Sequence, residues 1–166
     1  YNVMAAFYTA CSSFMGQNWG AGKHRRMMQS YYISLGYSFA IAAVLGILFR
    51  LCGEPFLYLF TDEPAVVAAG MQRMKIMCYS YALSAFMDCT IAASRGLGKT
   101  VVPTIIVVSG SCIFRIAWVY TIFAYFHTIP SLYLLYVCSW TLTAIFEIIY
   151  FRHALKKQFA AEPQPV

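Results

Sequence analysis

Hydrophobic residues follow one another along this chain in long runs, and polar residues gather in short stretches between them. Apolar segments occupy residues 1–15, 29–49, 66–93, 101–126 and 131–151. A helix needs ~20 apolar residues to cross the hydrocarbon core of a bilayer, and the last four segments are that long. They are too long and too continuously apolar to be the alternating strands of a barrel. The pattern predicts an all-α integral membrane protein, a polytopic bundle of transmembrane helices.

The two ends of the chain differ from the segments between them. The first apolar segment is short and already begins at Tyr1, so we expect the end of a helix in a chain truncated at its N-terminus. No basic region and no small-residue cleavage site precede it, which is unlike a signal peptide. The tail, residues 160–166, contains Pro163 and Pro165 and is predicted to be a disordered cytoplasmic extension. Residues 1–159 are therefore expected to form one transmembrane unit.

The composition supports this interpretation and excludes several other classes of protein. Hydrophobic residues make up 61% of the chain and charged residues only 11%, against roughly 25% charged in soluble domains. The six cysteines include no CxxC pair and form no cluster with the three histidines, so neither a metal site nor a cofactor is expected. Methionine and aromatic residues between Met71 and Met87 are expected mainly to pack, although such side chains also adapt to varied organic ligands.

The basic residues alternate between the two sides of the predicted bundle. The richer set comprises eight residues: Lys23, Arg25, Arg26, Arg95, Lys99, Arg152, Lys156 and Lys157. The opposite set holds Arg50, Arg73 and Lys75. Because cytoplasmic connections carry the excess of Lys and Arg, the richer side and the C-terminus are predicted to be cytoplasmic in a multi-pass protein of the plasma membrane. The net charge of +6 is thus explained by topology rather than by nucleic-acid binding.

One connection on the opposite side contains an apolar stretch of its own. Residues 54–64 have an apolar middle that is too short to span the bilayer. We expect this stretch to lie in the outer interface, with Pro64 in the first turn of the next helix.

Asp88 is the most informative single residue. It lies seven residues before Arg95, roughly 10 Å inside the membrane boundary by helical rise. Tyr81 and Ser84 precede it by seven and four residues, so the three share one face of the helix. Carboxylate and hydroxyl oxygens suit a hard cation, and the stripe is a candidate site for a proton or sodium ion. Structural pairing of Asp88 with Arg95 is the alternative.

Two further charges lie within predicted membrane spans. Arg115 is near the middle of the fourth segment, and Glu147 is five residues before Arg152. A lone arginine in lipid is costly, so Arg115 should point inward and meet a carboxylate or the carbonyls of a helix end. The favoured interpretation is a structural pair with Glu147 or Asp88, and a role in gating is the other.

Glycine-rich motifs mark two connections on the predicted cytoplasmic side. Their candidate hinge residues are Gly16, Gln17, Gly20 and Gly22 in the first, and Arg95, Gly96 and Gly98 in the second. Residues 93–100 nearly match a phosphate-binding P-loop, but such a loop follows a buried strand, and here a membrane-length helix precedes it. A tight turn whose glycines adopt positive φ explains the second motif better.

Taken in order, the motifs resemble the multidrug and toxic compound extrusion (MATE) family. Phe14-Met15-Gly16-Gln17-Asn18-Trp19-Gly20-Ala21-Gly22-Lys23 resembles its GQN-x-GAGK stretch. An external element of the family is similar to Leu59-Phe60-Thr61-Asp62-Glu63-Pro64. One of its cytoplasmic turns resembles Ser94-Arg95-Gly96-Leu97-Gly98-Lys99-Thr100. Part of a later helix resembles Phe114-Arg115-Ile116-Ala117-Trp118.

The resemblance implies twelve helices in two lobes. This chain would then be a partial C-terminal lobe, with the end of the eighth helix followed by helices nine to twelve. Its partners would be the lipid bilayer and the missing N-terminal lobe of the same chain. Some members carry a cation-site aspartate on the tenth helix about one turn earlier, where this chain has Ser84, and the acid here is Asp88.

Function is expected to follow that resemblance. The leading hypothesis is a secondary antiporter that exports small organic cations in exchange for protons or sodium. A flippase for a lipid-linked precursor is the alternative within transport, although only Arg115 could meet its phosphates inside the membrane. A membrane scaffold subunit without transport is the alternative of another class. No nucleophile–base pair predicts an enzyme.

Overall fold

The computed structural model describes residues 2–126 and 129–161, and within those ranges every regular element is a helix. The elements are α1 (Asn2–Gly20), α2 (His24–Tyr58), α3 (Pro64–Gly96), α4 (Val101–Val108), η1 (Ser109–Ile113), α5 (Phe114–Trp118), η2 (Val119–Phe123), α6 (Ala124–Phe126) and α7 (Ile129–Ala161). The all-α expectation is therefore confirmed.

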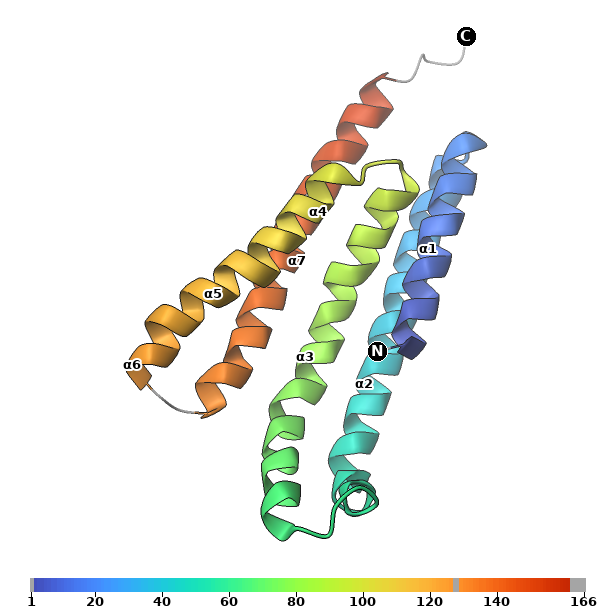
Figure 1. Ribbon diagram of the computed structural model, residues 1–166. Helices are drawn as coiled ribbons and strands as arrows, with labels where there is room; N and C mark the ends of the chain where they lie inside the picture. The colour runs from blue at the N-terminus through green and yellow to red at the C-terminus, as the bar shows by residue number, and fades with distance from the viewer. Residues whose placement is uncertain (1, 127–128, 162–166) are drawn as a thin grey trace.

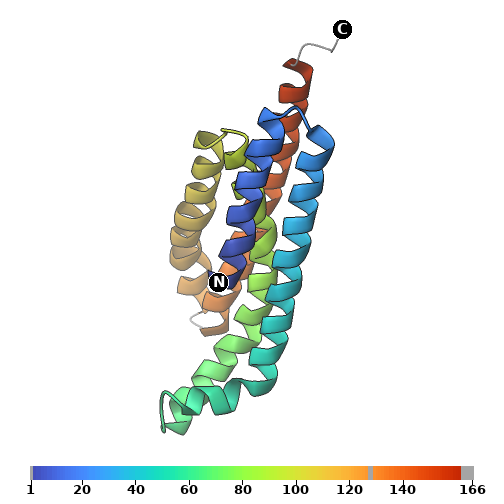
Figure 2. The same cartoon turned by 90° about the vertical axis from the view of Figure 1, so that its right-hand side faces the viewer.

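Helix α3 is the centre of the bundle. It packs against α1, α2 and α7, and Figure 1 shows it between the α1–α2 pair and the hairpin formed by α4 to α7. The turned view in Figure 2 shows α1 and α2 running side by side along α3. A residue on α3 therefore faces a different neighbour on almost every side.

Within the described residues, four helical runs are long and apolar enough to cross a membrane. They are His24–Tyr58, Pro64–Gly96, Val101–Phe126 and Ser131–Ala160, with lengths of 35, 33, 26 and 30 residues. Figure 1 places the connections α1–α2 and α3–α4 and the end of α7 at one end of the bundle, and the α2–α3 connection at the other. The eight basic residues of the richer set thus gather at one end, as a multi-pass membrane protein requires.

Helix α2 continues beyond its apolar segment, which corrects one expectation. We expected a break after residue 49 and a separate element at 54–64, but helical structure runs to Tyr58 with Pro55 inside it. Proline removes a helix hydrogen bond and bends the axis. The last turns of α2 are accordingly turned aside, end-on in Figure 1 and in profile in Figure 2. The predicted position of Pro64 in the first turn of α3 is confirmed.

The largest buried cluster lies toward the end of the bundle that carries the basic residues. It joins four helices through these side chains: Cys11, Met15, Met27, Tyr31, Cys89, Ala93, Leu97, Phe151 and Leu155. The phenol of Tyr31 and the hydroxyl of Thr90 form a hydrogen bond of 2.9 Å that ties α2 to α3 inside the protein. This anchored end holds α1, α2, α3 and α7 in fixed register.

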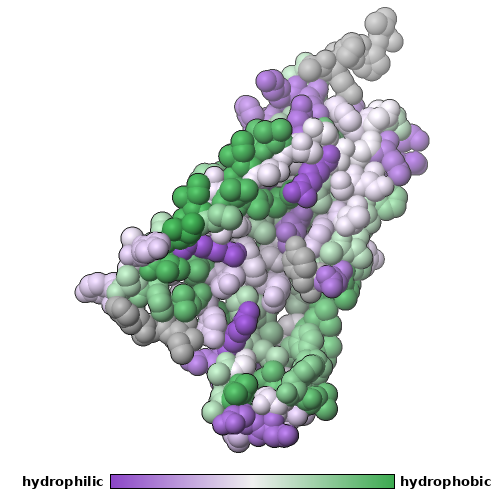
Figure 3. Space-filling view, viewed as in Figure 1, coloured by the Kyte–Doolittle hydropathy of each residue, from purple (hydrophilic) through white to green (hydrophobic). Residues whose placement is uncertain are grey.

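The run from α4 to α6 is one continuous helix interrupted by two π-helical segments, η1 and η2. Few of its side chains are buried, and it contacts mainly α7. Figure 3 shows a broad hydrophobic surface over α4 and α5, which suits contact with lipid. π-Segments are uncommon and often mark positions where a helix contributes to function. Here they lie on either side of Arg115.

Candidate functional site

The predicted polar stripe on α3 is present, and its three residues have different surroundings. Ser84 is 1% exposed, and its hydroxyl donates to the carbonyl of Tyr81 at 2.9 Å. The ring of Tyr81 packs against Trp140 of α7, with centroids 5.6 Å apart. Asp88 is half-buried, and its Oδ2 is buried without a hydrogen-bond partner among the described residues. The stripe therefore offers an acceptor oxygen that the protein itself leaves open.

Other small hydroxyls line α3 beside the stripe, and sequence reasoning did not single them out. Ser80 and Thr90 are fully buried, and both donate to carbonyls of the preceding turn. Ser94 is also fully buried, but its hydroxyl has no partner in the described structure. Small polar residues allow helices to approach closely in a membrane. The recurrence of these serine and threonine residues along an otherwise apolar segment was the sequence signal that could have identified this face as one of close helix packing.

Arg115 points inward, as predicted, but the predicted charge pair is wrong. Its Nε donates to the hydroxyl of Ser139 at 3.2 Å, and that hydroxyl donates to the carbonyl of Gly110 at 2.8 Å. The guanidinium lies over the ring of Tyr136, 4.5 Å from the centroid. The arginine is thus held by a hydroxyl and an aromatic face in place of the expected carboxylate.

The carbonyl that ends the hydroxyl relay belongs to the π-segment η1. Such segments are uncommon and often lie at functional positions. Gly110 also lies against Thr143 so closely that a Cβ would overlap the threonine hydroxyl. The fourth segment and α7 therefore meet through a glycine, two hydroxyls and one arginine, and the indole Nε1 of Trp118 also donates to the carbonyl of Ser131 at 3.2 Å.

Glu147 does not pair with Arg115 or with any other described residue. It is 0% exposed, and neither carboxyl oxygen has a hydrogen-bond partner in the described part of the chain. The expectation failed because the two residues lie at different heights: Arg115 is engaged by Ser139, which is two turns before Glu147 on the same buried stripe of α7. The other expected pair, Arg115 with Asp88, is not seen either, since Oδ2 of Asp88 has no partner among the described residues.

The two glycine motifs end helices in the same way. Gly22 and Gly98 have φ of 67° and 74°. The amide of Lys23 donates to the carbonyl of Asn18, and the amide of Lys99 to that of Ser94. This is the bonding of a Schellman cap, in which a glycine with positive φ satisfies the last carbonyls. The P-loop-like stretch therefore terminates α3, whereas a P-loop opens a helix at its phosphate.

The remaining motif residues lie on helices rather than in flexible joints. Gly16 and Gln17 are inside α1, and Gly20 is its last residue. Gln17 donates to the hydroxyl of Ser13 at 3.3 Å on the exposed face. Arg95 and Gly96 form the last turn of α3, where Gly96 packs against the carbonyl of Ser12. The term hinge therefore fits only the two glycines with positive φ.

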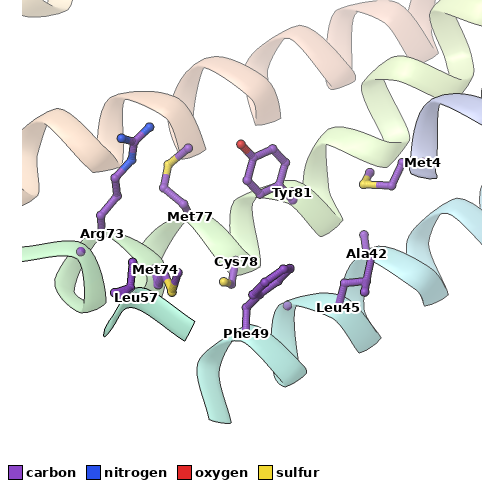
Figure 4. A pocket seen from close by; sticks show the side chains of 12 residues that line it. Met4, Ala42, Leu45, Phe49, Leu57, Arg73, Met74, Met77, Cys78 and Tyr81 are labelled. Carbon is purple, nitrogen blue, oxygen red and sulfur yellow. The ribbon is translucent and has the colours of Figure 1, made fainter. Parts of the chain in front are cut away.

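A cavity of about 470 Å³ opens beside the stripe, among α1, α2 and the first half of α3. Figure 4 shows Phe49 of α2 beside Cys78 of α3, and Arg73, Met77 and Tyr81 along one side of α3. Its lining is Met4, Ala42, Leu45, Gly46, Phe49, Leu57, Gly70, Arg73, Met74, Met77, Cys78 and Tyr81. Tyr81 belongs both to this lining and to the Asp88 stripe, so the cavity and the open carboxylate adjoin the same side of α3.

The motif order, the helical architecture and this site can now be compared with known proteins. The sequence matches the MatE family over residues 1–121. The chain belongs to the MatE family. No curated protein matches it in sequence.

Two solved structures resemble this MatE chain over most of its length. One is a multidrug resistance MATE family transporter of the MOP superfamily in an inward-facing conformation, with a TM-score of 0.81 and 17% identity. The other is such a transporter in an outward-facing conformation, with a TM-score of 0.80 and 22% identity. The matches cover 94% and 93% of this chain but 36% of each transporter. The fold is therefore that of about a third of a MATE transporter.

Proposed function

We propose that this chain forms part of a secondary antiporter that exports organic cations in exchange for protons or sodium ions. The single observation that carries the proposal is the open carboxylate oxygen of Asp88 on the central helix. An acid in a membrane span is costly and usually marks an ion pathway or a proton relay. At Asp88, a bound proton or sodium ion can be replaced by a positively charged substrate.

The cavity that Tyr81 lines, two turns from Asp88 on α3, has the chemistry that such a substrate requires. Its volume falls within the range of about 300–1,000 Å³ that is typical of small-molecule sites. Methionine side chains adapt to ligands of different shape, and the faces of Phe49 and Tyr81 attract organic cations. Substrate and coupling ion would then compete for Asp88, so that occupancy by one favours release of the other.

The likeness to both an inward-facing and an outward-facing transporter supports alternating access. The two TM-scores, 0.81 and 0.80, are nearly equal. We infer that the helices described here keep their arrangement in both states and that the bundle moves as a unit against the rest of the transporter. The coupling carboxylate on α3 would then face opposite sides of the membrane in turn.

The alternative function, flipping of a lipid-linked precursor, has one observation in its favour. Arg73 lies at the edge of the cavity and could meet a phosphate. Several cations would be needed to stabilise a diphosphate, and the lining contains only this one among the described residues. The organic-cation proposal is therefore preferred.

The test is transport by the full-length protein in proteoliposomes under an imposed proton or sodium gradient. Asp88→Asn should abolish gradient-driven uptake of an ethidium-type cation while leaving protein folding intact. Asp62→Asn, which makes the same chemical change in the exposed α2–α3 connection, should transport normally. Normal transport by Asp88→Asn would remove Asp88 from the coupling site. Absence of cation transport by the wild-type protein, together with movement of a labelled lipid, would favour the flippase.

A further inference from the structure

Glu147 is a buried acid that the proposed antiport cycle does not yet use. Its side chain is fully buried in α7, and both carboxyl oxygens lack a partner among the described residues. A charged carboxylate without a hydrogen bond or a counter-ion is strongly unfavourable in a medium of low dielectric constant. A neutral carboxyl, which carries a proton, is far less costly in the same place.

The burial of Glu147 follows from the sequence of α7. Every fourth residue from Ser131 to Leu155 is buried, in the order Ser131, Leu135, Ser139, Thr143, Glu147, Phe151 and Leu155. Four residues advance a helix by slightly more than one turn, so this stripe winds gradually around α7. Thr143 faces the fourth segment at Gly110, whereas Phe151 belongs to the main cluster. Glu147 lies between these contacts, where α7 packs against α3.

The contacts between α3 and α7 fix the depth of Glu147. Tyr81 packs against Trp140 near the middle of the bundle, and the side-chain amide of Gln158 donates to the carbonyl of Leu97, 61 positions earlier. The two helices thus run parallel with a nearly constant offset. The same offset places Glu147 beside the turn that contains Asp88. The two acids of the membrane interior therefore lie at the same depth on adjacent helices.

The charged and titratable groups around Glu147 are few. From α3, the charge of Arg95 reaches it, and Asp88 and Cys89 belong to the turn at its own depth. From the fourth segment, Arg115 is already bound to Ser139, and α4 itself contains no titratable side chain. In the resting structure, then, no described cation neutralises Glu147 by direct contact.

We propose that Glu147 is a second proton-binding site, which is occupied while α3 and α7 are closely packed. The proton leaves only when water or the guanidinium of Arg95 reaches the carboxyl. The unpartnered hydroxyl of Ser94, buried on the α3 side, is available to receive such water. The coupling of this release to export rests on the proposed antiport function, but proton binding itself does not.

Chemical labelling of the full-length protein in liposomes tests the site directly. A hydrophobic carbodiimide adds across the O–H of a protonated carboxyl in an apolar setting, and the O-acylisourea rearranges to a stable N-acylurea without losing an atom. We expect this adduct on the Glu147 peptide, with a yield that falls as pH rises. A water-soluble carbodiimide should label the exposed Glu54 instead. Absence of the hydrophobic adduct at every pH, or equal labelling of Glu147 by both reagents, would overturn the proposal.

Infrared spectroscopy provides an independent measurement on the reconstituted protein. Acid-minus-alkaline difference spectra should contain the C=O stretch of a buried carboxylic acid, which is lost in Glu147→Gln, retained in Glu54→Gln and shifted in Glu147→Asp. Identical spectra for wild type and Glu147→Gln would refute proton binding. If the band titrates while the wild-type protein shows no gradient-driven transport, the antiport proposal fails and the proton site stands. If the wild-type protein transports under a gradient while its spectrum contains no band that depends on Glu147, the proton site fails and the antiport proposal stands.

Discussion

Gly16 and Gly96 show how much a single missing side chain can determine. They meet where α1 crosses α3: a Cβ on Gly16 would lie 3.0 Å from the carbonyl oxygen of Gly96, and one on Gly96 would overlap the carbonyl of Ser12. Small residues at such crossings let two backbones approach within a membrane, where there is no hydrophobic force to bring helices together. The glycines are therefore required for packing as well as for turns.

Replacing Gly96 with alanine should destabilise the bundle. The added methyl group meets backbone atoms, which cannot rotate away, so we expect a loss of about 1–3 kcal/mol in the free energy of unfolding. Thermal unfolding of the purified full-length protein measures this as a lower midpoint. Gly20→Ala, in the other glycine motif, is the control because nothing lies within 4 Å of its Cβ position. Equal midpoints for Gly96→Ala and wild type would contradict the close contact.

Residue identity alone predicted that Arg115, Glu147 and Asp88 are inward-facing or functional, but not which residues they would meet. Opposite charge made Arg115 and Glu147 natural partners, although Arg115 was expected to lie deeper. The observed partner, Ser139, precedes Glu147 on the same buried stripe of α7 by roughly 12 Å of helical rise. Which turn of one helix meets which turn of its neighbour depends on tertiary packing, and local sequence does not fix it. The hydroxyl of Ser139, which replaced the expected carboxylate, has no distinguishing sequence pattern.

At the scale of elements, the fourth segment is joined to α7 by the relay from Arg115 through Ser139 to Gly110 and by the bond from the indole of Trp118 to the carbonyl of Ser131. In the relay, the serine hydroxyl accepts from the arginine and donates to the carbonyl, and Tyr136 covers the guanidinium. Because the segment from α4 to α6 has few other buried contacts, loss of one member should loosen the whole hairpin.

Ser139→Ala tests that dependence. The substitution leaves both the arginine Nε and the Gly110 carbonyl without their partner, which costs about 1–3 kcal/mol when such groups are buried. Amide hydrogen exchange in residues 101–126 should become faster, while exchange in α1 to α3 stays unchanged. Thr141→Ala removes an exposed hydroxyl of the same helix that bonds only to its own backbone, and it should have little effect. Unchanged exchange in the serine variant would show that the relay does not hold the hairpin.

The elements themselves were largely predictable, because bilayer thickness sets the length of an apolar segment and lipid requires helices. Their ends were less so. Helix α2 continues past Arg50 and Glu54 to Tyr58, and α1 continues to Gly20. Backbone hydrogen bonding does not stop where hydropathy changes, and a proline bends a helix without necessarily ending it. The expected tail at 160–166 lies mostly outside the described residues, although Ala160 and Ala161 still belong to α7.

At the scale of the whole molecule, the bundle is proposed to move as one body, and a buried thiol pair offers a way to test this. Cys11 of α1 and Cys89 of α3 are both free, fully buried and 3.8 Å apart at their sulfur atoms. Diamide oxidises two thiols to a disulfide as it is itself reduced to a hydrazine. The resulting bond would fix α1 to α3 in the arrangement seen here.

We expect the oxidised full-length protein to retain gradient-driven transport, because α1 and α3 need not separate during alternating access. Non-reducing peptide mass spectrometry should detect the Cys11–Cys89 cross-link, which Cys11→Ser abolishes. Transport is then compared before oxidation, after oxidation and after reduction. A reversible loss of transport in the cross-linked protein, absent from Cys11→Ser, would mean that these helices move relative to each other.

We predict the orientation of the bundle in the membrane from its charge asymmetry. Eight basic residues gather at the end that holds the α1–α2 and α3–α4 connections and the end of α7. The opposite end holds the last turns of α2 with Glu54 and the α2–α3 connection with Asp62 and Glu63. Since Lys and Arg remain in the cytoplasm during insertion, a cysteine at Asp62 should react with a membrane-impermeant maleimide in intact cells, and one at Lys156 should react only after permeabilisation. The reversed pattern would invert the orientation.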